Sequence, residues 1–183
     1  KMVSQLKDRK GSMEERQAAA KALAAVGNQE ALSAAISILG NSEEPDALQS
    51  SVITSLSEAG KIEQAAGIFG KLKPSLRTLA FDEILKRPEA SLALLKSVEA
   101  GTVNAEVFGP GNVGRLRTHP DKRVSSLANS LADKLAPGAK AKAEVIANRI
   151  PEVSKPGNVE NGKTLFSAAC VVCHRYGDLG THD

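Results

Sequence analysis

The amino-acid sequence predicts an all-α protein, and three observations lead to that prediction. Apolar residues make up 42% of the chain and are mostly alanine, leucine, valine and isoleucine, with no tryptophan, one tyrosine and four phenylalanines. Such small side chains allow helices to approach one another closely. Apolar residues also recur at i, i+3, i+4 and i+7, which is the spacing of one helix face. Finally, glycines and prolines separate segments of helical length.

The first three helices are expected to have recognisable ends. Residues 12–15, Ser-Met-Glu-Glu, form the pattern of a capping box before an alanine-rich helix that ends at Gly27. Asn28 is suited to cap the second helix, which is expected to end at Gly40. A third helix is expected over about 44–59, where the apolar pattern resumes.

Three further helices follow before the pattern changes. A fourth helix is expected to end at Gly70, and Pro74 and Pro88 each open another, because proline is favoured in the first helical turn. Gly101 closes the sixth helix. The residues expected to face the core are Ile62, Ala65, Ala66, Phe69, Leu76, Leu79, Ala80, Ile84, Leu92, Leu95 and Val98.

The pattern of core positions repeats along the chain. Two sets of residues are each spaced at intervals of thirty: Leu32, Ile62 and Leu92, and Ala35, Ala65 and Leu95. A fixed period of this length with two helices per unit is typical of an α-solenoid, in which stacked pairs bury one continuous core. The predicted fold is therefore an α-solenoid of helix pairs.

Residues 102–118 are expected to interrupt the thirty-residue repeat. Gly109, Pro110 and Gly111 predict a break, and the G-x-G-x-x-G spacing that they begin is interpreted as a loop because no strand precedes it. His119 is expected to be a loop residue rather than a ligand.

The chain is expected to return to helix after this interruption. Asp121 is predicted to cap a helix that continues through Leu135 and ends at Pro137 and Gly138. One more helix is expected over about 139–149.

The prolines and glycine of residues 151–157 predict a linker. The expected organisation is a helical repeat domain at 1–150, a linker at 151–157 and a second domain at 158–183. A short helix is expected to begin at Asn158 or Val159. The chain begins Lys-Met-Val without a secretory signal, so it is expected to be the inside of a longer protein.

Charge and motifs exclude several function classes. The net charge is +3 without a basic run or an aromatic platform, so nucleic-acid binding is not expected. No apolar stretch is long enough to predict a membrane span. The acidic pairs Glu14-Glu15 and Glu43-Glu44 are interpreted as first-turn acids. No catalytic residue is predicted in the repeats.

The pentapeptide Cys170-Val-Val-Cys173-His174 holds both cysteines and one of the three histidines. C-x-x-C-H is the attachment signature of c-type haem. Two thiols separated by two residues on a helical turn reach the two vinyl groups on one edge of the macrocycle. The next histidine then lies under the iron as proximal ligand.

Other chemistries of this motif stay open. A C-x-x-C pair also occurs in redox dithiols and in zinc sites, and three residues can fall in this order by chance. A zinc site would draw on Cys170, Cys173, His174 and His182, and two adjacent ligands strain a shared tetrahedron. A redox dithiol usually follows a strand in a βαβ unit, and no such pattern is present. Haem attachment is therefore favoured.

Two segments resemble known families. Residues 120–124 with Leu127 and Ala128 resemble a HEAT repeat, with a generic helical bundle as the rival interpretation. Gly162-Lys163, Leu165-Phe166 and the pentapeptide resemble the opening of a class I cytochrome c domain. This resemblance implies that Cys170 and Cys173 hold haem c covalently, that His174 is the proximal ligand to the iron and that Phe166 packs beside the haem.

The whole chain resembles the membrane-bound dehydrogenases that carry HEAT-like repeats and a C-terminal haem-binding domain. That resemblance implies electron transfer in a parent protein, a redox partner protein or an adjacent dehydrogenase domain, and a periplasmic or exported location. The β-propeller found upstream in that family has no counterpart here. The rival prediction is a helical-repeat interaction scaffold without a redox role.

The chain departs from a class I cytochrome c in its length. It stops nine residues after His174, and its two methionines, Met2 and Met13, belong to the N-terminal helices. The sixth ligand is therefore unknown. Either the chain is the truncated start of a haem domain, which we favour, or the iron keeps an open or borrowed position. His182 is a candidate stand-in.

Overall fold

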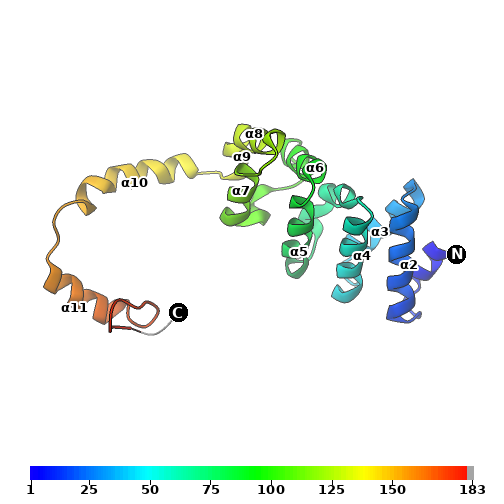
Figure 1. Ribbon diagram of the computed structural model, residues 1–183, viewed down its shortest axis with the longest axis horizontal. Coiled ribbons are helices and arrows are strands. Elements are labelled where there is room, and N and C mark those ends of the chain that lie inside the picture. Colours follow the sequence, from blue (N-terminus) through cyan, green and yellow to red (C-terminus); the bar gives the residue numbers. More distant parts are fainter. Residues whose placement is uncertain (181–183) are drawn as a thin grey trace. The chain divides into compact units, whose positions relative to one another are not determined.

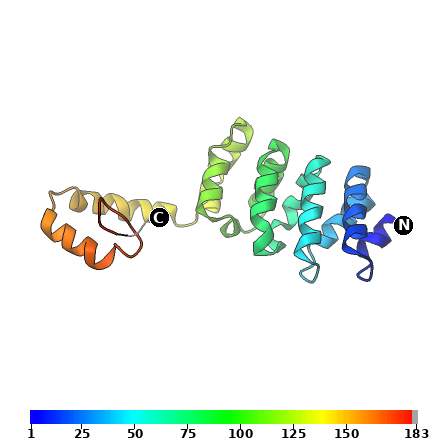
Figure 2. The same ribbon diagram turned by 60° about the horizontal axis from the view of Figure 1, so that its bottom comes forward.

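The computed structural model describes residues 1–180, apart from the side chains of residues 139 and 140. Within that span the chain forms eleven α-helices and two 3-10 helices (Figures 1 and 2). Residues 1–180 contain no strand, and the one β feature among them is an isolated bridge between Tyr176 and Leu179. The all-α prediction is confirmed. Contacts divide the chain into two compact units, 1–138 and 139–183, which are described separately.

The first unit is built from short helices that follow one another closely along the chain. Its elements are α1 (Met2–Lys7), α2 (Met13–Val26), α3 (Gln29–Leu39), α4 (Asp46–Glu58), η1 (Ile62–Lys71), α5 (Pro74–Leu85), α6 (Pro88–Glu99), η2 (Ala105–Phe108), α7 (Gly109–Arg117), α8 (Lys122–Ser130) and α9 (Ala132–Leu135).

Local chemistry fixes the helix ends that the sequence predicted. The Ser12 hydroxyl accepts the Glu15 N–H at 3.2 Å while the Glu15 carboxylate accepts the Ser12 N–H at 3.1 Å, which completes the capping box. Gly27 ends α2 at φ 62°, a left-handed conformation that glycine adopts without steric cost. The Asn28 side chain accepts the Ala31 N–H at 2.9 Å and caps α3. These three predictions are confirmed.

The helices of the first unit pack in two rows. Contacts run from α2 to α4 to α5 in one row and from α3 to η1 to α6 to α8 in the other (Figure 1). Sequential neighbours such as α2 and α3, α5 and α6, and α7 and α8 join the rows. The residues between them form one apolar core, in which the largest fully buried side chains include Phe69, Phe81, Leu48, Ile53, Leu56, Ile62, Leu94 and Leu95.

The fourth predicted helix is a 3-10 helix. Element η1 runs from Ile62 to Lys71, and all four apolar residues predicted for it are buried. Gly67 and Gly70 lie inside this segment, and glycine weakens an α-helix by about 1 kcal/mol per residue relative to alanine. We attribute the change of helix type to these two glycines.

The loop expected around Gly109 is wrong, because these residues begin α7. Pro110 lies in the first turn, where a missing N–H costs no intrahelical hydrogen bond. Gly109 adopts φ 71°, which lets the chain turn directly from η2 into α7. The G-x-G-x-x-G spacing through Gly114 is thus helical rather than a phosphate-binding loop.

Two other predictions change in detail. Glu44 is not a first-turn acid: it lies before the start of α4 and is buried against Arg16. The helix expected from Asp121 to Leu135 is interrupted at Leu131, which separates α8 from α9. Asp121 caps α8 as predicted, because its carboxylate accepts the Arg123 N–H at 2.8 Å.

The second unit consists of two helices and a terminal turn. Helix α10 spans Ala139–Val153 and α11 spans Val159–Ala169. The helix expected over 139–149 therefore continues past Pro151, so the first three residues of the predicted linker are helical. Helix α11 begins at Val159, as expected, and Asn158 caps it by accepting the Asn161 N–H at 2.9 Å.

The second unit has no buried side chain among those described from residue 141 to residue 180. Its best-covered residues are only half-buried: Phe166, Cys170, Val171 and Leu179. Because burial of apolar surface is the main stabilising contribution to folding, this unit lacks a hydrophobic core of its own in the part described. The contact division at Gly138 also lies upstream of the boundary expected at residue 150.

Candidate functional site

The C-x-x-C-H pentapeptide continues the end of α11. Cys170 is the C-cap of that helix, and its N–H donates to the Phe166 carbonyl at 2.8 Å. The N–H groups of Cys173 and His174 both donate to the Cys170 carbonyl, at 3.1 and 2.8 Å. An i to i+4 bond closes one further helical turn, so positions 170 and 174 lie on the same side of the chain.

All three residues predicted for the site thus lie on one turn. Both cysteines are free thiols; Cys170 is half-buried and Cys173 is exposed. His174 is also exposed. The Cys173 thiol and the His174 imidazole are therefore accessible to an incoming group, whereas the Cys170 thiol is partly covered by its own unit.

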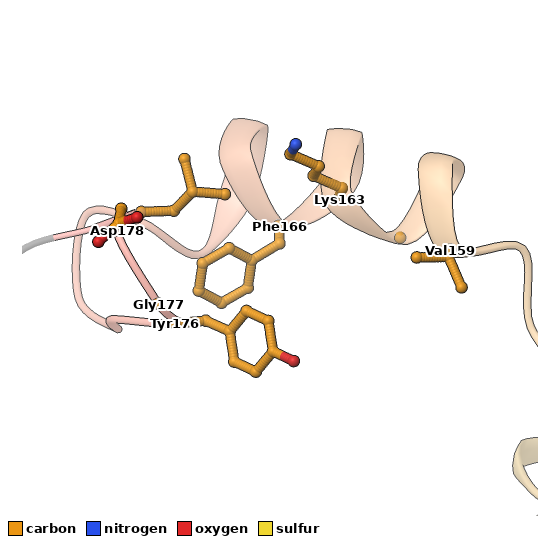
Figure 3. A pocket seen from close by; sticks show the side chains of 8 residues that line it. Val159, Lys163, Phe166, Tyr176, Gly177 and Asp178 are labelled. Carbon is orange, nitrogen blue, oxygen red and sulfur yellow. The ribbon is translucent and has the colours of Figure 1, made fainter.

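An apolar pocket of about 570 Å³ lies in the same unit. Figure 3 shows the rings of Phe166 and Tyr176 next to each other; their centroids are 6.2 Å apart and the contact is edge to face. The lining residues are Val159, Gly162, Lys163, Phe166, Tyr176, Gly177, Asp178 and Leu179. Aromatic and aliphatic side chains dominate this wall, which is typical of small-molecule and cofactor sites.

The pocket and the first cysteine share a face of α11. Val159, Gly162 and Phe166 are spaced at i, i+3 and i+7 along one helix face, and Cys170 follows four residues later. A molecule in the pocket would therefore lie against the same face of α11 that leads to Cys170.

The far wall of the pocket comes from a tight reverse turn that sequence analysis missed. Tyr176 and Leu179 exchange two backbone hydrogen bonds, at 2.9 and 3.1 Å, and Gly177 adopts φ 58°. Gly-Asp between two apolar residues is a known hairpin signal, so Gly177-Asp178 could have revealed this turn.

Three observations concern the other candidate ligands. Within residues 1–180, no group of three or more His, Cys, Asp or Glu side chains is placed to hold a metal ion. Met2 and Met13 lie in the first unit. His182, the candidate sixth ligand, lies outside the described residues.

Comparisons with known proteins add no identification. No family model, curated protein or solved structure matches this chain. The resemblances drawn from the sequence therefore stay predictions. Among the helices described, none combines the length and apolar content needed to cross a bilayer.

Proposed function

We propose that the C-terminal part of this chain holds a c-type haem covalently and passes single electrons in its parent protein. The supporting observation is that Cys170, Cys173 and His174 occupy one helical turn beside an apolar pocket. In this proposal Cys170 and Cys173 would hold the haem through thioether links, and the His174 imidazole would ligate its iron.

The residues present fit such a group by their chemistry. Covalent attachment needs two reduced thiols, and both cysteines are unpaired. A haem face needs apolar cover, which Phe166, Tyr176 and Leu179 supply at the pocket wall. The exposed imidazole of His174 follows directly in the chain, as proximal ligation in c-type sites requires.

The bound haem would supply one-electron redox chemistry. The chain's own residues bind and orient it: the hydrogen bond from the Cys170 N–H to the Phe166 carbonyl anchors the attachment turn to α11. The apolar wall excludes water from one side, which is one means by which proteins set a haem potential. The sixth ligand, the electron donor and the acceptor stay unassigned, and we propose no catalytic step for this chain.

The proposal also implies a cellular location and a redox partner. Covalent haem attachment takes place outside the bacterial cytoplasm, so the parent would be periplasmic or exported. A redox partner protein or an adjacent dehydrogenase domain would exchange electrons with the haem.

Expression of the full chain in an exporting host with a haem-attachment system tests the proposal. We expect a Soret band and haem that stays with the polypeptide on a denaturing gel. Cys170→Ser and Cys173→Ser should each remove one thioether, and the double variant should lose covalent haem altogether. Val171→Ala, which alters only the spacer, is the matched control. A colourless chain with intact thiols would overturn the proposal.

We also propose that the first unit is an α-solenoid of HEAT-like pairs and acts as a scaffold. Its support is a series of side-chain contacts that join residues 30 to 35 positions apart, close to the thirty-residue period. They are Gln17 to Ala47, Arg87 to Ser57, Arg115 to Asp82, His119 to Leu85, Arg123 to Glu89 and Lys134 to Glu99.

Amide hydrogen exchange on the full chain tests the solenoid. Each repeat of a solenoid contacts only its neighbours, so the stack opens from its ends. We expect the amides of α2 and α8 to exchange faster than those of α4 and α5. Uniform protection across these helices would favour the generic helical bundle instead. The same scaffold without haem is the alternative function, and the attachment experiment above separates the two.

A further inference from the structure

Helix α10 carries an apolar stripe that nothing in its unit covers. Ile146, Ile150 and Val153 are 60%, 52% and 77% exposed. They are spaced by four and three residues, so they lie on one face of the helix. Helix α11 carries a matching stripe of Val159, Gly162 and Phe166, and it has no buried residue.

The residues of the two stripes have the same spacing when they are counted outward from the loop that joins α10 to α11. Only residues 154–158 separate α10 from α11, and connections of two to five residues are typical of antiparallel helical hairpins. Away from this loop, both stripes have spacings of three and then four residues. At 1.5 Å per residue each extends about 10 Å from its first residue to its last.

An antiparallel hairpin would therefore match the stripes residue by residue. Val153 would meet Val159, Ile150 would meet Gly162, and Ile146 would meet Phe166. Nothing lies within 4 Å of the position that a Cβ would take at Gly162, so there is room for the larger side chain of Ile150. Small-against-large pairing of this kind allows helices to pack closely.

We infer that α10 is a lid that folds back on α11 and covers the pocket beside Phe166. The short tether keeps the lid at an effective concentration on the order of millimolar near its target. Closure buries both stripes and restricts the approach to Cys170 along the shared face of α11. The lid forms from residues of this chain alone and does not depend on the proposed haem.

A single tryptophan at position 166 reports on the lid, because the natural chain contains none. In the full chain, Phe166→Trp should emit at short wavelength and be quenched weakly by iodide. Adding Ile150→Asp should shift the emission to that of a water-exposed indole and increase the quenching several-fold. Adding Asn148→Asp is the matched control, because position 148 lies on the opposite, exposed face of α10 and should leave the emission unchanged.

A second measurement uses the unmodified chain. Nuclear Overhauser contacts between the Ile150 methyl groups and the Gly162 α-protons are expected if the lid closes, and their absence would overturn the inference. Equal emission from all three tryptophan variants would also overturn it. An emission shift that depends on protein concentration would also overturn the inference, because it would show that a second copy of the chain covers the apolar stripe.

Discussion

The His119 imidazole contacts the carbonyl of Leu85, 34 residues earlier, through Nε2 at 3.1 Å. Nδ1 of the same ring accepts the Asp121 N–H at 3.0 Å, so Nε2 carries the proton and donates to Leu85. The ring thus links the start of α8 to the end of α5, where a carbonyl has no intrahelical partner. His119 lies in the loop before α8, as the sequence predicted, and its hydrogen bonds give it a structural role.

Replacing His119 should therefore weaken the first unit without affecting the C-x-x-C-H turn proposed to hold haem. We expect His119→Ala to lower the free energy of unfolding by about 1–3 kcal/mol, because it removes two hydrogen bonds that each typically contribute about 0.5–1.5 kcal/mol net. Urea unfolding of the full chain, followed by circular dichroism, measures the change. Ser126→Ala, an exposed substitution on α8, is the control, and an equal loss in both variants would contradict the assigned role.

Glu44 should be the most sensitive acidic residue of the chain. Its Oε2 pairs with Nη2 of Arg16 at 2.5 Å, and both side chains are at most 5% exposed. Removing one partner leaves a buried charge uncompensated, so Glu44→Ala should cost about 3–5 kcal/mol. Glu43→Ala is the matched control, because Glu43 is 72% exposed and its pair with Arg9 should contribute under about 1 kcal/mol. Equal unfolding midpoints would contradict this prediction.

Local chemistry explains what the sequence could predict of this fold. Ser12, Asn28 and Asn158 cap helices through hydrogen bonds to residues three positions away, so a short window contains all the information needed. The apolar positions of η1 were likewise predictable, although its 3-10 geometry was not. The hydrogen bonds of the C-x-x-C-H turn are equally local, because they join residues three and four positions apart.

Contacts between distant residues explain what the sequence could not predict. The burial of Glu44 depends on Arg16, which lies 28 positions earlier, and no local pattern links the two. The pocket likewise joins two separate segments, because Val159 and Phe166 of α11 line it together with Leu179 of the terminal turn. The turn itself has a local signal, but no local pattern shows that it folds back against α11.

Phe81 should be essential to the core of the first unit. It is fully buried, and its ring contacts Phe69 and Phe108 at centroid distances of 6.1 and 5.7 Å. Phe81→Ala should cost about 3–5 kcal/mol, because it leaves a cavity beside the two 3-10 helices η1 and η2. Phe166→Ala is the control: this ring is only half-buried in a unit without a core, so global unfolding should change far less. A comparable loss in both would show that the second unit contributes to the core.

The ionisation of Asp121 should make the stability of the folded chain depend on pH in the acidic range. Hydrogen bonds from the Arg123 side chain, and then from its backbone N–H, lower the pKa of Asp121 from 3.8 to about 2. The carboxylate therefore stabilises the folded chain fully above about pH 4, and this contribution is lost as the pH falls through about 2. Arg123→Gln should raise the pKa of Asp121 towards its ordinary value. A carboxyl NMR titration measures it, and an unchanged titration would contradict the assigned cause.

Two glycines at the start of α7 should respond to alanine in opposite directions. Gly109 adopts φ 71° and ψ 162°, a conformation essentially restricted to glycine that costs about 1–3 kcal/mol for a residue with a Cβ, so Gly109→Ala should destabilise the chain. Gly111 lies inside the helix, and nothing lies within 4 Å of the position that a Cβ would take there, so Gly111→Ala should stabilise it by about 0.4–1 kcal/mol. Thermal unfolding of the two variants measures both signs. A loss of stability in both variants would contradict this assignment, because it would mean that Gly111 also has a backbone conformation that alanine cannot adopt without strain.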